Sequence, residues 1–119
     1  MKYCWLSVLK MNEGVGLDPD RGRLLRAVLA PYAEKIDRVA VFGSYATGRA
    51  RPNSDIDLVI YGRLDSGEID RLYTLFDDSA LSVTVDVVAY DDALYPPLKA
   101  HIDAVAVTLF DHDDLKATP

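Results

Sequence analysis

The chain has 119 residues and a formal net charge of −6, with 50% hydrophobic and 27% charged residues. This length suits one domain, and the hydrophobic share excludes wholesale disorder. The acidic balance argues against a protein that binds polynucleotides through clustered Lys and Arg, but it leaves open a nucleotide whose charge is carried by metal ions.

The N-terminal segment and the single cysteine narrow the class of protein further. Cys4 alone excludes an internal disulfide framework and a Cys-based zinc site. No run approaches the roughly 18 apolar residues of a membrane span, and segment 1–9 is too short for a signal peptide. We therefore expect a cytoplasmic protein without a membrane partner. Met11 is an alternative to Met1 as the start of the chain.

The first predicted elements are a helix and a strand. Asp18 is a candidate N-cap, followed by a proline in the first turn, and apolar residues then recur at helical spacing up to Ile36. Pro31 should kink or divide this helix because it removes a backbone donor. Residues Arg38–Phe42 are rich in β-branched side chains, which predicts a short strand ended by a glycine.

The remaining elements alternate in the same way. A second strand is predicted over Asp55–Tyr61, a helix starting near Asp65 with one buried stripe, and a strand over Ser82–Tyr90. A last helix should run from Pro96 to about Ala104. A fourth strand, near an edge of the sheet, is predicted over Val105–Phe110, and the tail after it is expected to be polar and loose, with solvated carboxylates at Asp111, Asp113 and Asp114.

Strands that alternate with helices predict an α/β domain in which one sheet carries packed helices. The connection between the first two strands is only about a dozen residues long, which suits either an antiparallel pair or a tight crossover. We expect a single domain over residues 1–119, with its core at about 18–111 and peripheral segments at 1–17 and 112–119.

Three aspartates carry the first chemical signal. Asp55 and Asp57 are two positions apart on a predicted strand, so both side chains leave the same face. Two such carboxylates repel each other unless a cation lies between them, and oxygen ligands suit Mg²⁺. Asp86 lies inside an otherwise apolar strand, where an unpaired charge is costly. If the two strands are neighbours, these carboxylates supply the ligands for two-metal displacement at phosphorus.

A Gly-Ser pair carries the second signal. Gly43 and Ser44 end a strand and open a turn or short helix, where free N–H groups and the hydroxyl can hold phosphate oxygens. Gly48 provides a second bend that would return the loop toward Asp55. The interpretation of Tyr45, His101 and His112 is structural: packing or surface residues rather than ligands.

This combination resembles a known family. Gly43-Ser44, followed after ten residues by Asp55-x-Asp57, resembles the signature of the nucleotidyltransferase superfamily that includes DNA polymerase beta. The ending Arg-Pro-x-Ser-Asp-Ile-Asp-Leu at Arg51–Leu58 is similar to the minimal nucleotidyltransferases in particular. The resemblance implies a mixed sheet of about four strands, ATP as substrate, and two Mg²⁺ ions.

The resemblance also implies roles for individual residues. Asp55, Asp57 and Asp86 would be the metal ligands and the catalytic residues. The nucleotide would be bound by Gly43, Ser44, Arg49 and Ser54. Thr47 departs from the family pattern, in which relatives often have arginine, and Arg49 or Arg51 would then supply the missing phosphate contact.

Minimal members of this family are often encoded beside a HEPN ribonuclease toxin, and they act as its antitoxin by transferring AMP to a tyrosine. The resemblance therefore implies a HEPN toxin partner, bound in a hetero-complex, with a homo-oligomer as a further possibility. From its length we expect the chain to have no acceptor domain of its own, which fits that class. Two alternatives stay open: an aminoglycoside-type, small-molecule nucleotidyltransferase, and a non-catalytic antitoxin that neutralises its partner by binding.

Overall fold

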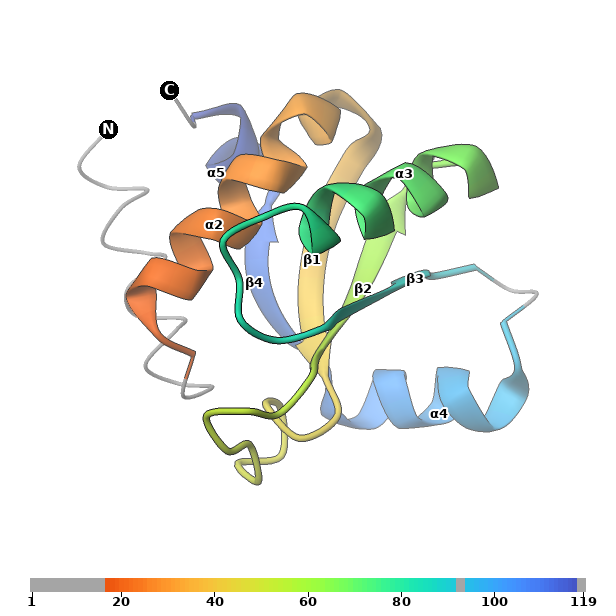
Figure 1. Ribbon diagram of the computed structural model, residues 1–119. Coiled ribbons are helices and arrows are strands. Elements are labelled where there is room, and N and C mark those ends of the chain that lie inside the picture. Colours follow the sequence, from red (N-terminus) through yellow and green to blue (C-terminus); the bar gives the residue numbers. More distant parts are fainter. Residues whose placement is uncertain (1–16, 92–93, 118–119) are drawn as a thin grey trace.

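The computed structural model describes residues 17–91 and 94–117 of the chain. Its centre is a four-stranded sheet in the order β3-β2-β1-β4 (Figure 1). Its strands are β1 (Ile36–Phe42), β2 (Ile56–Gly62), β3 (Val85–Ala89) and β4 (Val107–Asp111). The predicted α/β fold with about four strands is confirmed, and so is the edge position of the last strand. Cys4 and both candidate start residues lie outside the described residues.

The helices follow the start and stop signals of the sequence. They are α2 (Pro19–Leu29), the 3₁₀ segment η1 (Ala30–Lys35), α3 (Ser66–Asp77), α4 (Pro96–Val105) and α5 (His112–Lys116). Asp18 caps α2 by accepting a hydrogen bond of 2.7 Å from the Asp20 N–H. The predicted division at Pro31 is confirmed, because the α-helix gives way to 3₁₀ geometry there. In the described part of the chain no helix is long and apolar enough to span a membrane.

The sheet is mixed, and its pairing decides where the carboxylates meet. Strand β1 pairs antiparallel with both β2 and β4, so the short connection after β1 is antiparallel rather than a crossover. Strand β2 pairs in parallel with β3, which makes the two aspartate-bearing strands neighbours. This adjacency is the condition on which the sequence-based metal hypothesis depends.

Each face of the sheet has its own apolar layer. Alternate side chains of β2, including Ile56, Leu58 and Ile60, pack with α2, α3 and α5 on one face. On the other face, Ala40, Phe42 and Val59 pack under Ile102 of α4. Figure 1 shows this arrangement, with α4 alone below the sheet and the other helices on its opposite side. Because the side chains alternate, Asp57 and Asp86 emerge on the α4 side.

The C-terminal segment corrects the sequence prediction of a loose tail. Residues His112–Lys116 form α5, which begins with a capping box. The Asp114 N–H donates to the Asp111 carboxylate at 2.8 Å, and the Asp111 N–H donates to the Asp114 carboxylate at 3.1 Å. Asp114 is 7% exposed rather than solvated, and its carbonyl accepts two hydrogen bonds from the buried Arg26 guanidinium. Strands β3 and β4 start later than predicted, at Val85 and Val107, whereas β1 starts earlier, at Ile36.

Leu115→Ala tests whether α5 belongs to the core. Leu115 is 1% exposed within the larger apolar layer, so its truncation should lower the free energy of unfolding by about 2–4 kcal/mol. The exposed neighbour Lys116→Ala should change it by less than about 0.5 kcal/mol. Urea denaturation of both variants measures the difference, and equal effects would place α5 outside the cooperative core.

Candidate active site

Two aspartates face each other across the parallel pair of strands. Asp57 of β2 is the register partner of Asp86 of β3, and both side chains are half-buried. The sequence alone placed Asp86 inside an apolar strand but could not place that strand beside β2. The register now brings the two carboxylates together at the start of both strands, beside the 43–55 connection.

The proximity of these groups changes the acidity of Asp57. Its pKa rises to about 6, first because the carboxyl is partly buried and then because of the negative charges of Asp86 and Asp55. A hydrogen bond shared with the Asp86 carboxyl holds the proton further. Carboxylates that repel each other in this way favour a cation between them.

The raised pKa predicts a pH-dependent stability effect in protein stripped of divalent cations. Between pH 4 and pH 6 the folded state binds the Asp57 proton more tightly than the unfolded chain does, so stability falls as the pH rises. Asp57→Asn removes this loss. Because the carboxyl is only partly buried and solvent screens its charge, we expect a discounted gain of about 1 kcal/mol above pH 7 that vanishes below about pH 4. Urea denaturation at several pH values measures it, and a pH-independent difference would contradict it.

The Gly43 turn lies directly against Asp57. Gly43 has a φ of +70° and directly follows β1, whose last residue, Phe42, is the register partner of Asp57. A β-carbon at Gly43 would overlap Oδ2 of Asp57. Glycine is therefore required twice here, for the left-handed conformation and for the close approach of the carboxylate.

Hydrogen bonds within the 43–55 loop shape the turn that follows. The Gly43 carbonyl accepts from the N–H groups of Ala46 and Thr47, each at 3.1 Å, and from the Thr47 hydroxyl at 3.1 Å. Thr47, the departure from the family pattern, thus closes the turn. The Arg49 N–H donates to the Ser44 carbonyl at 2.9 Å, while the Arg49 side chain is exposed. The Ser54 hydroxyl accepts from the Arg51 N–H at 2.7 Å.

Asp55 lies on the same side of the sheet but is exposed, just before β2 begins. Within residues 17–91 and 94–117 no three His, Cys, Asp or Glu side chains are gathered closely enough to hold a metal ion by themselves. The donor set still fits Mg²⁺, which commonly binds through one or two carboxylates plus phosphate oxygens of a substrate. The opposed Asp57–Asp86 pair provides those two carboxylates.

His101 is a feature of the site that sequence reasoning did not assign to it. The exposed imidazole lies on α4 in edge contact with Phe42, with ring centroids 6.2 Å apart. Its charge opposes the rise that burial and the neighbouring carboxylates cause in the pKa of Asp57. No spacing in the sequence joins His101 to the Asp motif, because α4 reaches the site only through tertiary packing. Tyr45, by contrast, is 3% exposed and packs in the core, as interpreted.

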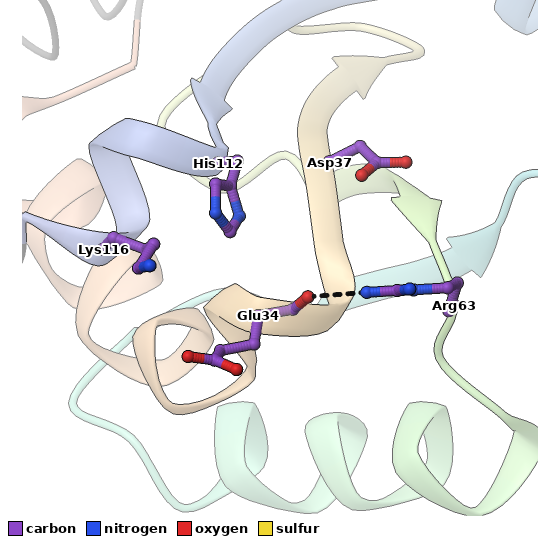
Figure 2. A pocket seen from close by; sticks show the side chains of 5 residues that line it. All are labelled: Glu34, Asp37, Arg63, His112 and Lys116. Atoms are coloured by element: carbon purple, nitrogen blue, oxygen red, sulfur yellow. Dashed lines mark hydrogen bonds between the residues drawn. The ribbon is translucent and has the colours of Figure 1, made fainter.

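A hollow of about 460 Å³ lies next to α5, at the ends of β1 and β2 that are far from the aspartate pair. Arg63 donates a hydrogen bond of 3.1 Å to the Glu34 carbonyl, drawn as the dashed line in Figure 2, and His112 lines the same hollow. The Nδ1 of His112 lies 2.8 Å from the Ala33 carbonyl oxygen, so His112 has the structural role interpreted for it. This hollow lacks the strand-opposed carboxylates, so it is not the candidate catalytic site.

Comparison with known proteins agrees with this fold and site. The model of the family "Polymerase beta, Nucleotidyltransferase" matches residues 25–115, which span β1, β2 and β3 with all three aspartates. The chain therefore belongs to the polymerase beta nucleotidyltransferase family and is an enzyme of the nucleotidyltransferase class. No curated protein sequence matches the chain.

Solved structures of toxin–antitoxin complexes contain similar chains. A chain from a toxin–antitoxin crystal structure with AMP-PNP is 26% identical, with a TM-score of 0.60 over 74% of this chain and 73% of that one. A chain from a mutant of the toxin–antitoxin MntA-HpeT is 25% identical, with a TM-score of 0.58 over 74% and 72%. Another MntA-HpeT mutant, at 24% identity and a TM-score of 0.59 over 74% and 73%, shows the shared fold alone.

Proposed function

We propose that this protein is a Mg²⁺-dependent adenylyltransferase that acts as the antitoxin of a toxin–antitoxin pair. It would transfer AMP from ATP to a tyrosine hydroxyl of a HEPN toxin in the cytoplasm. The observation that carries the proposal is the Asp57–Asp86 pair, placed in register against the Gly43 turn. The similarity to chains in toxin–antitoxin crystal structures, one with AMP-PNP, supports the partner and the nucleotide.

The proposed reaction is an in-line displacement at the α-phosphorus of ATP. A bond forms between the tyrosine oxygen and this phosphorus, and the bond from phosphorus to the α–β bridging oxygen breaks. Pyrophosphate leaves with that oxygen, and the hydroxyl proton passes to the Asp86 carboxylate. Bound Mg²⁺ would offset the charge that develops on the phosphate oxygens.

The candidate site residues have separate proposed roles in binding the metal, binding the phosphates and shaping the loop. Asp57 and Asp86 would hold the metal-chelated phosphates from the sheet, and the exposed Asp55 would complete the ligand set once the triphosphate is present. The backbone after Gly43 and the Ser44 hydroxyl would bind phosphate oxygens. Arg49 is exposed and would add a positive charge, while Ser54 shapes the loop through its bond to Arg51.

The test uses the purified protein, its co-encoded toxin and ATP labelled at either the α- or the γ-phosphate. We expect the α-label, but not the γ-label, to enter the toxin at a tyrosine, and only with Mg²⁺ present. Transfer of the γ-label would make the protein a kinase and contradict the proposal. Transfer to an aminoglycoside by the protein alone would support the small-molecule alternative. Neutralisation of the toxin without ATP would support the binding-only alternative.

A further inference from the structure

One arginine outside the sequence motif contacts loop 43–55 at two places. Arg21 of α2 donates from Nη1 to the Tyr45 hydroxyl at 3.0 Å and from Nη2 to the Pro52 carbonyl at 2.8 Å. The same Nη2 donates to the Ser82 hydroxyl at 3.3 Å. The three partners lie 24, 31 and 61 positions along the chain from Arg21.

These contacts join the segments that carry the candidate site. Tyr45 follows the Gly43-Ser44 turn, and Pro52 precedes the strand that bears Asp57. Ser82 precedes β3, which bears Asp86. A guanidinium offers several donors in one rigid plane, so a single side chain can hold all three segments, whereas a lysine ammonium is a compact point charge on a flexible stem.

Side chains only partly fill the space between α2 and loop 43–55. A hollow of about 290 Å³ lies between α2 and the loop, lined by Asp18, Arg21, Tyr45, Ala50, Arg51 and Pro52. The Tyr45 ring is buried in the core, so its hydroxyl is a fixed acceptor for Arg21. The hydrogen bonds of Arg21 thus cross the gap between helix and loop.

We propose that Arg21 is a positioning residue that holds loop 43–55 in the conformation that receives the triphosphate. The inference rests on the proposed nucleotide-binding function of that loop. Without Arg21, the loop must be ordered when the nucleotide binds, so affinity falls. Asp57 and Asp86 keep their positions on the sheet, so the rate of AMP transfer from bound ATP should change less than the affinity for ATP.

The experiment compares Arg21→Ala and Arg21→Lys with Arg23→Ala, a control on the same helix whose residue pairs with Asp20 instead. Calorimetry with AMP-PNP and Mg²⁺ measures the dissociation constant, and the transfer assay measures KM for ATP and kcat. We expect Arg21→Ala to raise the dissociation constant and KM by about tenfold, with kcat within about threefold of wild type. Arg21→Lys should restore little of this, and Arg23→Ala should bind as wild type does.

A second variant keeps the test decisive if Arg21→Ala does not fold. Tyr45→Phe retains the buried ring but loses the acceptor, and it should weaken AMP-PNP binding by about threefold. In a foldable Arg21→Ala protein, adding Tyr45→Phe should cause no further loss, because the shared bond is already gone.

Unchanged AMP-PNP binding in Arg21→Ala would overturn the inference, as would unchanged binding in Tyr45→Phe if only that variant folds. Equal weakening of binding in Arg21→Ala and Arg23→Ala would also overturn it. So would a wild type that does not bind AMP-PNP. A wild type that binds AMP-PNP but transfers no AMP to the toxin would contradict the proposed function. In that case the binding measurements still decide the role of Arg21.

Discussion

Asp57→Asn should lower the rate of AMP transfer by on the order of 10³. The amide keeps the size of the side chain but removes the negative charge that would face Mg²⁺ and the phosphates, which costs several kcal/mol in the transition state. Asp57 is the register partner of Asp86, so no other β2 side chain can occupy its position between that residue and the Gly43 turn. Single-turnover transfer with saturating ATP measures the effect.

The matched control is Asp37→Asn, an exposed carboxylate at the opposite end of the sheet, beside the hollow that Figure 2 shows. It should leave the transfer rate within about twofold of wild type. A rate for Asp57→Asn above a tenth of wild type would remove Asp57 from the catalytic set.

Gly43→Ala should lower the transfer rate by about 10²-fold. The new methyl group would overlap Oδ2 of Asp57 and displace that carboxylate, and a misplacement of this kind is enough for such a loss. The variant should also lose about 1–2 kcal/mol of stability because an L-residue adopts positive φ at a cost. Transfer kinetics and urea denaturation give both values.

Gly48→Ala separates the two effects. Gly48 has a similar φ of +76°, but a β-carbon there would meet nothing within 4 Å. It should show the same loss of stability with a transfer rate within a few-fold of wild type. Equal losses of rate in both variants would mean that backbone strain, rather than the displaced Asp57 carboxylate, explains the effect.

The sequence predicted the parts of the fold that depend on local signals. Side chains alternate along a strand, so placing Asp55 and Asp57 on one face leaves Ile56, Leu58 and Ile60 on the other, and all three are buried. The break at Pro31 and the cap at Asp18 are also local and are confirmed. Asp86 could be identified because a charge inside an apolar strand needs an explanation. Its meeting with Asp57 depended on strand order, which only the pairing of β2 with β3 decided.

Long-range contacts account for what the sequence could not predict. The segment His112–Lys116 is polar except for one leucine. Leu115 is buried because α5 packs against η1, β4 and β1, and Arg26 donates to the carbonyl of the preceding Asp114. Arg21 gave no signal because its partners are far away in the sequence and include a backbone carbonyl. His101 likewise reaches Phe42 only through the packing of α4.

The most direct test of the central claim, that Asp57 and Asp86 form a Mg²⁺-dependent nucleotide site, is calorimetric titration with AMP-PNP. We expect saturable binding by the wild type with Mg²⁺, at least tenfold weaker binding without it, and a comparable loss in Asp86→Asn with Mg²⁺ present. Equal affinity with and without Mg²⁺, or wild-type affinity in Asp86→Asn, would contradict it.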